Sequence, residues 1–261
     1  MKKKVILATA VSFVLLLLVI LAGLNAIYTV TSVRANFCTF SKEGESEARE
    51  LQEKLDSFVD KSAVFLDLDD VRETVEQYPY FRVEEVRKNY PDKLELKITE
   101  RKEVFAYKNQ NGKYVILDEQ GRPLREEDSN VNRAGGKNIL LEGFDFESDG
   151  EVRYFEEFIK IFTAFQEVLT EARANITSIE LVVKGSSATT IIDYIRVRMR
   201  EGVFFDIRNP YVQPYEKAHL AVERYTGTGR FEGNGLTDMQ RVQDEITVYE
   251  RGDELFISPE P

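Results

Sequence analysis

The stretch PYFRVEEVRKNYPDKLELKITER, residues 79–101, predicts a β-hairpin closed by a short turn. In its second half, apolar and polar residues alternate over residues 94–99, which is typical of a strand with one exposed face. The tripeptide Tyr-Pro-Asp at residues 90–92 provides the turn, because proline and aspartate both favour turn geometry.

The first strand of this hairpin carries an irregularity. Phe81 and Val83 alternate with polar residues, but Val86 is out of phase with them. Side chains along a strand have a strict period of two, so the phase changes only where an extra residue is inserted. We therefore expect a β-bulge at Glu84–Glu85.

Two amphipathic helices are predicted before the hairpin. Between residues 41 and 60, apolar residues recur at helical spacing and the other positions are mostly charged. From residue 64, a short strand-like segment leads into a second helix, for which Asp70 and Glu73 fit a capping box and Pro79 ends the helix. The inner positions are Ala48, Leu51, Leu55, Phe58 and Val59 in the first helix and Val71, Val75 and Tyr78 in the second. An apolar run at residues 28–33 predicts a strand before these helices. The order is therefore strand, helix, helix, strand, strand. In such a unit the two helices pack on one face of a small sheet, and we expect one edge of that sheet to be open.

An uncharged run of 26 residues, Val5–Val30, precedes these elements. Sixteen of its residues are Leu, Ile, Val or Phe, and about 20 apolar residues are enough for a helix to cross a bilayer. Three lysines at positions 2–4 precede the run, so the positive-inside rule places the N-terminus in the cytoplasm and residues 31–261 outside. A cleaved signal peptide is the alternative, but its apolar region is usually about 7–15 residues long, and a clear small-x-small cleavage site is missing. We expect a retained anchor with single-pass type II topology.

The order of these elements resembles a POTRA domain that follows a single membrane anchor. The matching positions are Pro79, Tyr80, Phe81, Val86, Arg87, Tyr90, Pro91, Asp92, Leu94, Leu96, Ile98, Glu100 and Arg101. A hairpin signal follows at Asn111-Gly112, and Leu117, Asp118 and Gly121 fill an aliphatic-aspartate-x-x-glycine pattern. Anchor, POTRA domain and hairpin in this order are similar to the FtsQ/DivIB family of bacterial cell-division proteins. The resemblance covers residues 2–125 closely and implies that a β domain follows.

The fold class expected for the whole chain is α+β, in three parts. Residues 1–30 form a cytoplasmic tail and transmembrane helix, residues 31–101 a β-α-α-β-β POTRA domain, and residues 102–261 a larger, mostly antiparallel β domain with helices on one face. The segment 149–174 predicts a long helix whose inner positions are Phe155, Phe158, Ile159, Phe162, Phe165 and Leu169. Residues 214–225 predict a second helix. The resemblance implies a short helix that contains a lysine in this part of the chain, and Lys217 fits it.

Several strands and loops are expected in the second half. Apolar residues alternate over residues 195–199 and 203–207, and Glu201-Gly202 turns the chain between them. The glycine-rich segment TGTGRFEGNG at residues 226–235 predicts a loop. It lacks the G-x-G-x-x-G pattern of a nucleotide site, and no βαβ unit surrounds it, so we expect no phosphate site there. Arg196, Arg198 and Arg200 share one face of a strand, which is either an ion-paired, solvated face or a docking surface for an acidic partner segment.

The sequence predicts no catalytic residue, no metal ligand and no cofactor-binding residue. Cys38 and His219 are the single cysteine and the single histidine, so they build neither an intrachain disulfide nor a zinc site. The acidic run LDLDD at residues 66–70 lacks the glycine and final glutamate of an EF-hand, and we assign its Asp69 and Asp70 to helix capping. Carboxylate-only catalysis, as in wall-cleaving glycosidases, needs just two acids, so a count of 46 acidic residues leaves that alternative open.

The charge distribution excludes nucleic acid as an expected partner. The net charge is −11, but residues 1–33 hold three lysines and no acid, so the remainder carries 32 basic against 46 acidic residues, or −14. A body with this charge is repelled by nucleic acid, by anionic lipid and by anionic wall polymers.

A final hairpin is predicted by EITVYERGDELFISP, residues 245–259, with its turn at Gly252-Asp253. We expect its last strand to lie at a sheet edge, with Leu255 and Ile257 on one face and an exposed Phe256 on the other. An open edge offers unpaired N–H and C=O groups to which a partner strand can add. An ordinary terminal strand is the alternative.

The resemblance implies a function for this hairpin. In the FtsQ/DivIB family, the last strands of the β domain bind a small coiled-coil division protein, FtsB or DivIC, by strand addition. The implied partner-binding residues are Tyr249, Arg251, Glu254, Leu255, Phe256, Ile257 and Ser258. The resemblance thus implies a non-enzymatic scaffold at the division septum, which binds FtsB/DivIC-like and FtsL-like bitopic proteins. It also implies that the scaffold takes no cofactor or small-molecule substrate and that it influences septal peptidoglycan synthesis. The alternatives are a POTRA-bearing export or assembly component and a membrane-anchored wall hydrolase.

Overall fold

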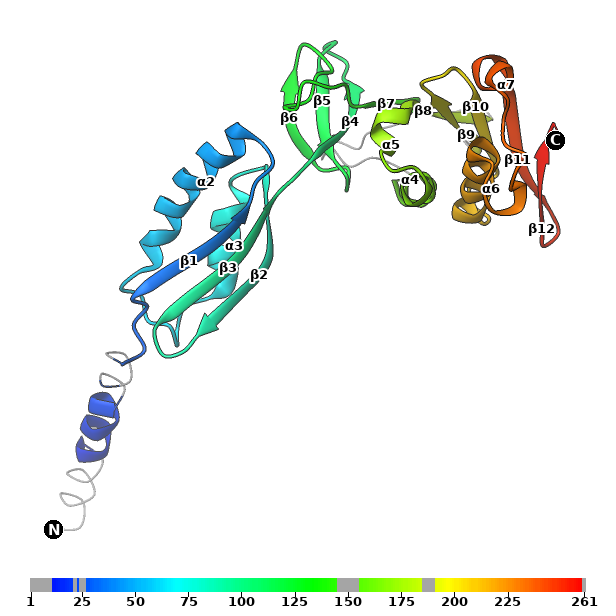
Figure 1. Ribbon diagram of the computed structural model, residues 1–261. Coiled ribbons are helices and arrows are strands. Elements are labelled where there is room, and N and C mark those ends of the chain that lie inside the picture. Colours follow the sequence, from blue (N-terminus) through cyan, green and yellow to red (C-terminus); the bar gives the residue numbers. More distant parts are fainter. Residues whose placement is uncertain (1–10, 21–22, 24–26, 145–154, 185–190, 260–261) are drawn as a thin grey trace. The chain divides into compact units, whose positions relative to one another are not determined.

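A computed structural model of the chain describes residues 11–20, 23, 27–144, 155–184 and 191–259 (Figure 1). The chain divides into two compact units, residues 1–102 and 103–261. Each unit encloses its own hydrophobic core.

The first unit contains a three-stranded sheet covered by two helices. Its strands are β1 (Ser32–Cys38), β2 (Phe81–Asn89) and β3 (Lys93–Glu100), in the order β1-β3-β2. β1 pairs parallel with β3, and β2 pairs antiparallel with it. The helices α2 (Lys42–Leu55) and α3 (Leu68–Glu76), with the 3-10 turn η1 (Asp56–Phe58), pack their apolar sides on this sheet. The predicted order of strand, helix, helix, strand and strand is confirmed, but the first strand lies at residues 32–38 and not at residues 28–33.

The predicted β-bulge in the first hairpin strand is also confirmed. The pairing of β2 with β3 shifts between Val83 and Glu85, so Glu84 has no partner in the register. The extra residue returns Val86 to the core face, where it is buried. The hydrophobic pattern, which requires a buried face, thus fixes where the strand bends.

Two expectations about the segment before α3 are wrong. Residues 63–65 form a turn and not a strand, because the backbone of the preceding residues bonds to residues 28–30 and the chain reverses there. The N-cap of α3 is Asp67, whose Oδ1 accepts from the N–H of Asp69 at 3.0 Å. Asp69 and Asp70 lie in the first helical turn, where the helix dipole favours acidic side chains.

The second unit contains one nine-stranded sheet. Its strands are β4 (Glu103–Lys108), β5 (Tyr114–Asp118), β6 (Pro123–Glu127), β7 (Ile139–Glu142), β8 (Ile176–Lys184), β9 (Ile191–Met199), β10 (Phe204–Arg208), β11 (Glu245–Arg251) and β12 (Glu254–Ser258). Their order is β12-β11-β10-β9-β8-β7-β4-β5-β6. The pairs β10–β11, β7–β8 and β4–β7 are parallel and the others are antiparallel, so the sheet is mostly antiparallel, as expected.

The helices of the second unit are α4 (Phe155–Val168), α5 (Ala172–Asn175), η2 (Gly229–Phe231), α6 (Pro214–Thr226) and α7 (Asp238–Gln243). α4 and α6 pack against each other, and α6 also packs against β10, β11 and β12. Together they cover the apolar face of the sheet. α6 matches the helix expected at residues 214–225, whereas α7 was not predicted.

The long helix expected at residues 149–174 is shorter than predicted. Residues 149–154 and the side chain of Phe155 lie outside the part of the chain that the structure describes. Within the described part, α4 ends at Val168, and Glu171, with φ −139° and ψ 78°, lies outside the helical region before α5 begins. The other inner positions predicted for this helix face the core, with Ile159 only half-buried.

The predicted membrane anchor falls only partly on described residues. Residues 11–20 are helical, and their large apolar side chains are exposed. Residues 1–10, 21–22 and 24–26 of the segment lie outside the described part. Among the residues that are described, none of the helices combines the length and the apolar character that crossing a membrane requires.

Candidate functional site

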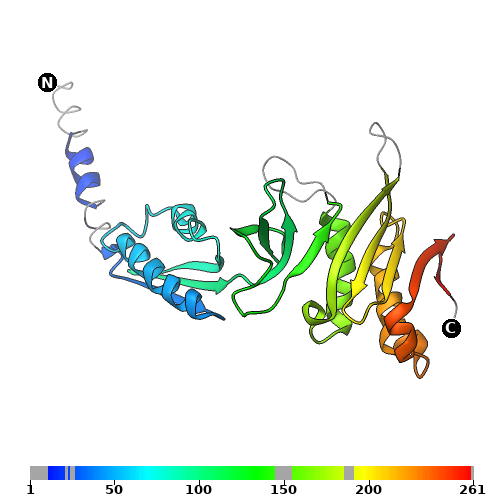
Figure 2. The same cartoon turned by 90° about the horizontal axis from the view of Figure 1, so that it is seen from above.

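The strand β12 is the outermost strand of the nine-stranded sheet. It pairs antiparallel with β11 on one side, through a turn in which Gly252 has φ +64°. No described strand pairs with its other side. Figure 2 shows β12, in red, at the margin of the sheet. The part of the chain that is described therefore has an open sheet edge here.

A hydrogen bond identifies which backbone groups of β12 face outward. The guanidinium Nη1 of Arg230 donates to the carbonyl oxygen of Leu255 at 3.3 Å, and Arg230 belongs to η2, not to β11. In an antiparallel strand the N–H and C=O of one residue point to the same side, and the sides alternate along the chain. Leu255 and Ile257 therefore turn their peptide groups outward, whereas Phe256 pairs with Tyr249 of β11.

The side chains of β12 divide between two faces. Ile257 is 6% exposed within the core, and Leu255 is half-buried against the same core. Phe256 lies on the opposite face, as expected, but it is half-buried because the ring of Tyr249 stacks on it with a centroid distance of 5.8 Å. The guanidinium of Arg251 covers both rings at 5.3 and 5.5 Å. Ile257 can thus offer a partner its backbone only, whereas the aromatic pair offers side-chain surface.

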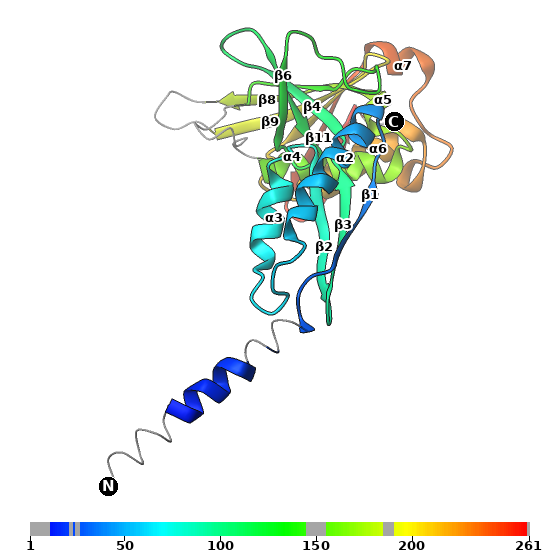
Figure 3. The same cartoon turned by 90° about the vertical axis from the view of Figure 1, so that its left-hand side faces the viewer.

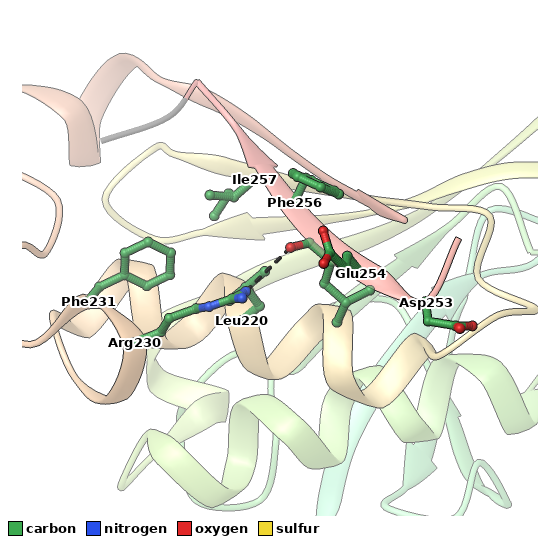
Figure 4. A pocket seen from close by; sticks show the side chains of 8 residues that line it. Leu220, Arg230, Phe231, Asp253, Glu254, Phe256 and Ile257 are labelled. Atoms are coloured by element: carbon green, nitrogen blue, oxygen red, sulfur yellow. Dashed lines mark hydrogen bonds between the residues drawn. The ribbon is translucent and has the colours of Figure 1, made fainter. Parts of the chain in front are cut away.

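A pocket of about 620 Å³ lies beside the edge. Leu220 of α6 and Phe231 of η2 supply apolar side chains to it, and residues 253–257 form its rim. Figure 4 shows Arg230 reaching from η2 to the carbonyl group of β12. A strand lying along β12 would place every second side chain on the side of this pocket.

An ion pair between Lys217 of α6 and Glu250 of β11 connects the last hairpin to the helix that covers it. Lys217 of α6 is fully buried, and its Nζ donates to the carbonyl oxygens of Arg208 and Asn209 at 2.8 and 3.0 Å and pairs with the carboxylate of Glu250. Asn209 Nδ2 also donates to Glu250 at 2.6 Å. Burial of Glu250 raises the pKa of its carboxyl, but the hydrogen bonds from Lys217 and Asn209 outweigh burial and lower this pKa below 4.5. Glu250 of β11 lies opposite Leu255 of β12, so the ion pair with Lys217 stabilises the edge strand β12 through β11.

Of the three arginines predicted to share one face of a strand, Arg196 is engaged within the chain, whereas Arg198 and Arg200 are exposed and Arg200 follows the end of β9. Arg196 forms a bidentate pair with the buried Asp206 at 2.7 and 2.8 Å and also binds Glu245 at 2.9 Å. The hydrogen bond and charge of Asp206 raise the pKa of Arg196 against the effect of burial. Arg198 lies over the ring of Phe204 at 4.4 Å. The ion-paired interpretation therefore holds for Arg196.

The single histidine and the single cysteine belong to different units. His219 lies 3.5 Å from Glu223 on α6, and Cys38 is exposed in the other unit. Within the described ranges, no three side chains among His, Cys, Asp and Glu are placed so that they could hold a metal ion.

Sequence reasoning missed the residues that shape the pocket. Arg230 and Phe231 belong to the segment predicted only as a glycine-rich loop, and their approach to β12 depends on the fold of the whole unit. The one available signal was composition, since an arginine and a phenylalanine interrupt a run of glycine and threonine.

Comparisons with known proteins give two partial matches to this chain. Residues 46–101 match the model of the FtsQ-type POTRA domain. A relative, the cell division protein FtsQ of Bartonella bacilliformis, is 38% identical over 60 residues, which are 23% of this chain and 19% of the relative. The match therefore spans about a fifth of that relative's length. The predicted resemblance to the FtsQ/DivIB family is confirmed by these matches.

Proposed function

We propose that this chain, whose POTRA domain is of the FtsQ type, is a membrane-anchored scaffold of the bacterial cell-division machinery that captures a partner strand at β12. The observation that carries the proposal is the open edge of β12, where the peptide groups of Leu255 and Ile257 face outward beside a pocket lined by both apolar and charged residues. Main-chain hydrogen bonds would give affinity, and the pocket would select the alternate side chains of the incoming strand.

Each residue of the edge has a distinct role in this proposal. Leu255 and Ile257 supply the backbone donors and acceptors. Phe256, with Tyr249 and Arg251, forms an aromatic surface on the other face, which would pack against the partner beyond its strand. Glu254 and Ser258 are exposed and mark the two ends of the docking edge. The guanidinium of Arg230 would leave the carbonyl group of Leu255 when a partner N–H takes its place.

The proposed partners are FtsB/DivIC-like and FtsL-like bitopic proteins, as the family resemblance implies. In this proposal residues 1–30 anchor the chain with its N-terminus in the cytoplasm, residues 31–101 are the POTRA domain and residues 102–261 the β domain. The exposed apolar side chains of the helical residues 11–20 support the anchor. Partners held in one bilayer meet at high effective concentration, so a modest interface suffices. The scaffold would influence septal peptidoglycan synthesis through these partners and would catalyse no reaction itself.

Capture of a DivIC-like ectodomain by the full chain in detergent tests this proposal. Phe256→Asp places a charge in the aromatic surface, and Leu255→Pro removes an outward N–H and puts a ring in the path of the added strand. We expect each variant to weaken capture at least tenfold, whereas Met239→Asp, at an exposed position of α7, leaves it unchanged.

Two results would contradict the proposal. The first is undiminished capture by folded Phe256→Asp and Leu255→Pro variants. The second is cleavage of purified peptidoglycan by the wild-type chain, which would favour the wall hydrolase.

A further inference from the structure

An exposed apolar tip lies at one end of the POTRA domain. It consists of the exposed Val64, Phe65 and Tyr90 together with the partly buried Tyr28, and these residues come from three separate segments. Phe65 is 73% exposed, Tyr90 56% and Val64 45%. A small domain normally buries such side chains, and an exposed apolar group of this kind marks a surface that meets another phase or molecule.

The three segments are held together by backbone hydrogen bonds. The N–H of Val30 donates to the carbonyl oxygen of Lys61 at 2.8 Å, and the N–H of Asp60 returns a bond to Val30 at 2.9 Å. On the other side, Thr31 donates through its N–H and its hydroxyl to Asp92 at 2.8 and 2.7 Å. Residues 28–31 therefore tie the turn before α3 to the turn between β2 and β3.

Two of the three aromatic rings of the tip are in contact as well. Tyr28 and Tyr90 meet edge to face, with their centroids 5.8 Å apart. Figures 1 and 3 show the start of β1, the link between α2 and α3, and the turn between β2 and β3 at the same end of the domain. The tip is thus a structured surface, not a set of unrelated exposed residues.

The chain enters the POTRA domain at this tip. Tyr28 lies at the C-terminal end of the apolar run Val5–Val30, so no linker separates the tip from that run. If the run crosses a bilayer, as the proposed function requires, the tip is covalently held at the level of the lipid headgroups. Tyrosine suits that level because its ring is apolar and its hydroxyl is polar.

We propose that this tip inserts into the interfacial region of the bilayer in which the chain is anchored. The inference rests on the proposed membrane anchor. Phe65 and Val64 would enter the acyl boundary, and Tyr28 and Tyr90 would lie among the headgroups. The contact fixes the tilt of the POTRA domain relative to the membrane, which a flexible tether alone would leave free.

The charges around the tip predict an apolar contact and not an electrostatic one. Charged residues of both signs flank the segments of the tip in the sequence, namely Lys61, Lys88 and Lys93 with Asp60, Asp67 and Asp92. Because these charges balance, attraction to anionic lipid adds little, and burial of apolar area is the remaining driving force. Insertion should therefore occur in zwitterionic bilayers and persist at high salt.

The absence of tryptophan from the sequence makes a direct test possible. Phe65→Trp introduces a single reporter into the full chain, which is reconstituted into phosphatidylcholine vesicles with and without brominated acyl chains. Met239→Trp, an exposed position of the other unit, is the matched control. We expect the tryptophan of Phe65→Trp to emit at shorter wavelength than the control and to lose most of its fluorescence to brominated lipid, at low and at high salt alike. Tyr90→Trp provides a second reporter if the first variant folds poorly.

Flotation of the vesicles separates this inference from the proposed function. If the chain floats with the vesicles but the tryptophans at positions 65 and 90 are quenched no more than the control, the anchor stands and the inserted tip is refuted. If quenching disappears at high salt, the contact is electrostatic and the apolar inference is overturned. If the chain does not float, the anchor fails, and both the proposed function and this inference fall with it.

Discussion

Lys217 is fully buried, and three acceptors from two neighbouring segments surround its ammonium group. Such a group is tolerated only while its partners remain, because an unpaired buried charge is strongly destabilising. The sequence marked Lys217 as a position on a helix, but its partners Asn209 and Glu250 are 8 and 33 positions away and are brought together only by the sheet. Local structure such as the turn at residues 90–92 could be predicted from the sequence, whereas contacts between residues that are far apart in the sequence could not.

We predict that Lys217→Met destabilises the β domain by about 3 kcal/mol at neutral pH, since Glu250 then lacks its cationic partner. The folded-state pKa of Glu250 is lowered, so its contribution is present above pH 4.5 and is lost as pH falls through the folded-state pKa. The difference between wild type and variant should therefore shrink below pH 4.5. Urea unfolding across this pH range measures it.

The matched control for this prediction is Lys160→Met, at an exposed position of α4, which should change stability by less than about 0.5 kcal/mol. Equal effects of the two variants, or a difference that grows as the solution is acidified, would contradict the role assigned to the buried pair.

Elements with a strong local pattern were predictable. The bulge in β2 followed from the phase of its apolar residues, and the final hairpin from alternation on both sides of Gly252-Asp253. The turn at residues 63–65 was not predictable, because an apolar pair such as Val64-Phe65 has the pattern of a buried strand wherever it lies. The early end of α4 was missed for a related reason, since Leu169 continues the apolar stripe although Glu171 leaves the helix.

Proline substitutions can test which peptide groups of β12 face outward and which pair with β11. Proline removes an N–H, which matters little on the open side of an edge strand and much on the paired side. We expect Phe256→Pro to unfold the β domain more easily than Phe256→Ala by about 3 kcal/mol, and Leu255→Pro to differ from Leu255→Ala by about 1 kcal/mol or less. Thermal or urea unfolding measures both comparisons, and the reverse ranking would show that the assigned register is wrong.

The molecule combines two units whose exposed features lie on different elements. The first unit carries the apolar tip where the chain enters it, and the second carries the open edge of β12. The α+β class and the presence of a POTRA domain followed from the sequence, because order and spacing of elements are local information. The pocket beside β12 did not, because Arg230 and Phe231 reach it only through the packing of η2 under the sheet edge.

Hydrogen exchange at single-residue resolution along β12, measured with and without a DivIC-like ectodomain, tests whether β12 binds a partner by strand addition. We expect the amides of Leu255 and Ile257 to exchange quickly in the free chain and to become protected when the partner binds. The amide of Phe256, already paired with β11, should be protected in both states. Capture of the partner with unchanged, rapid exchange at Leu255 and Ile257 would contradict strand addition at this edge.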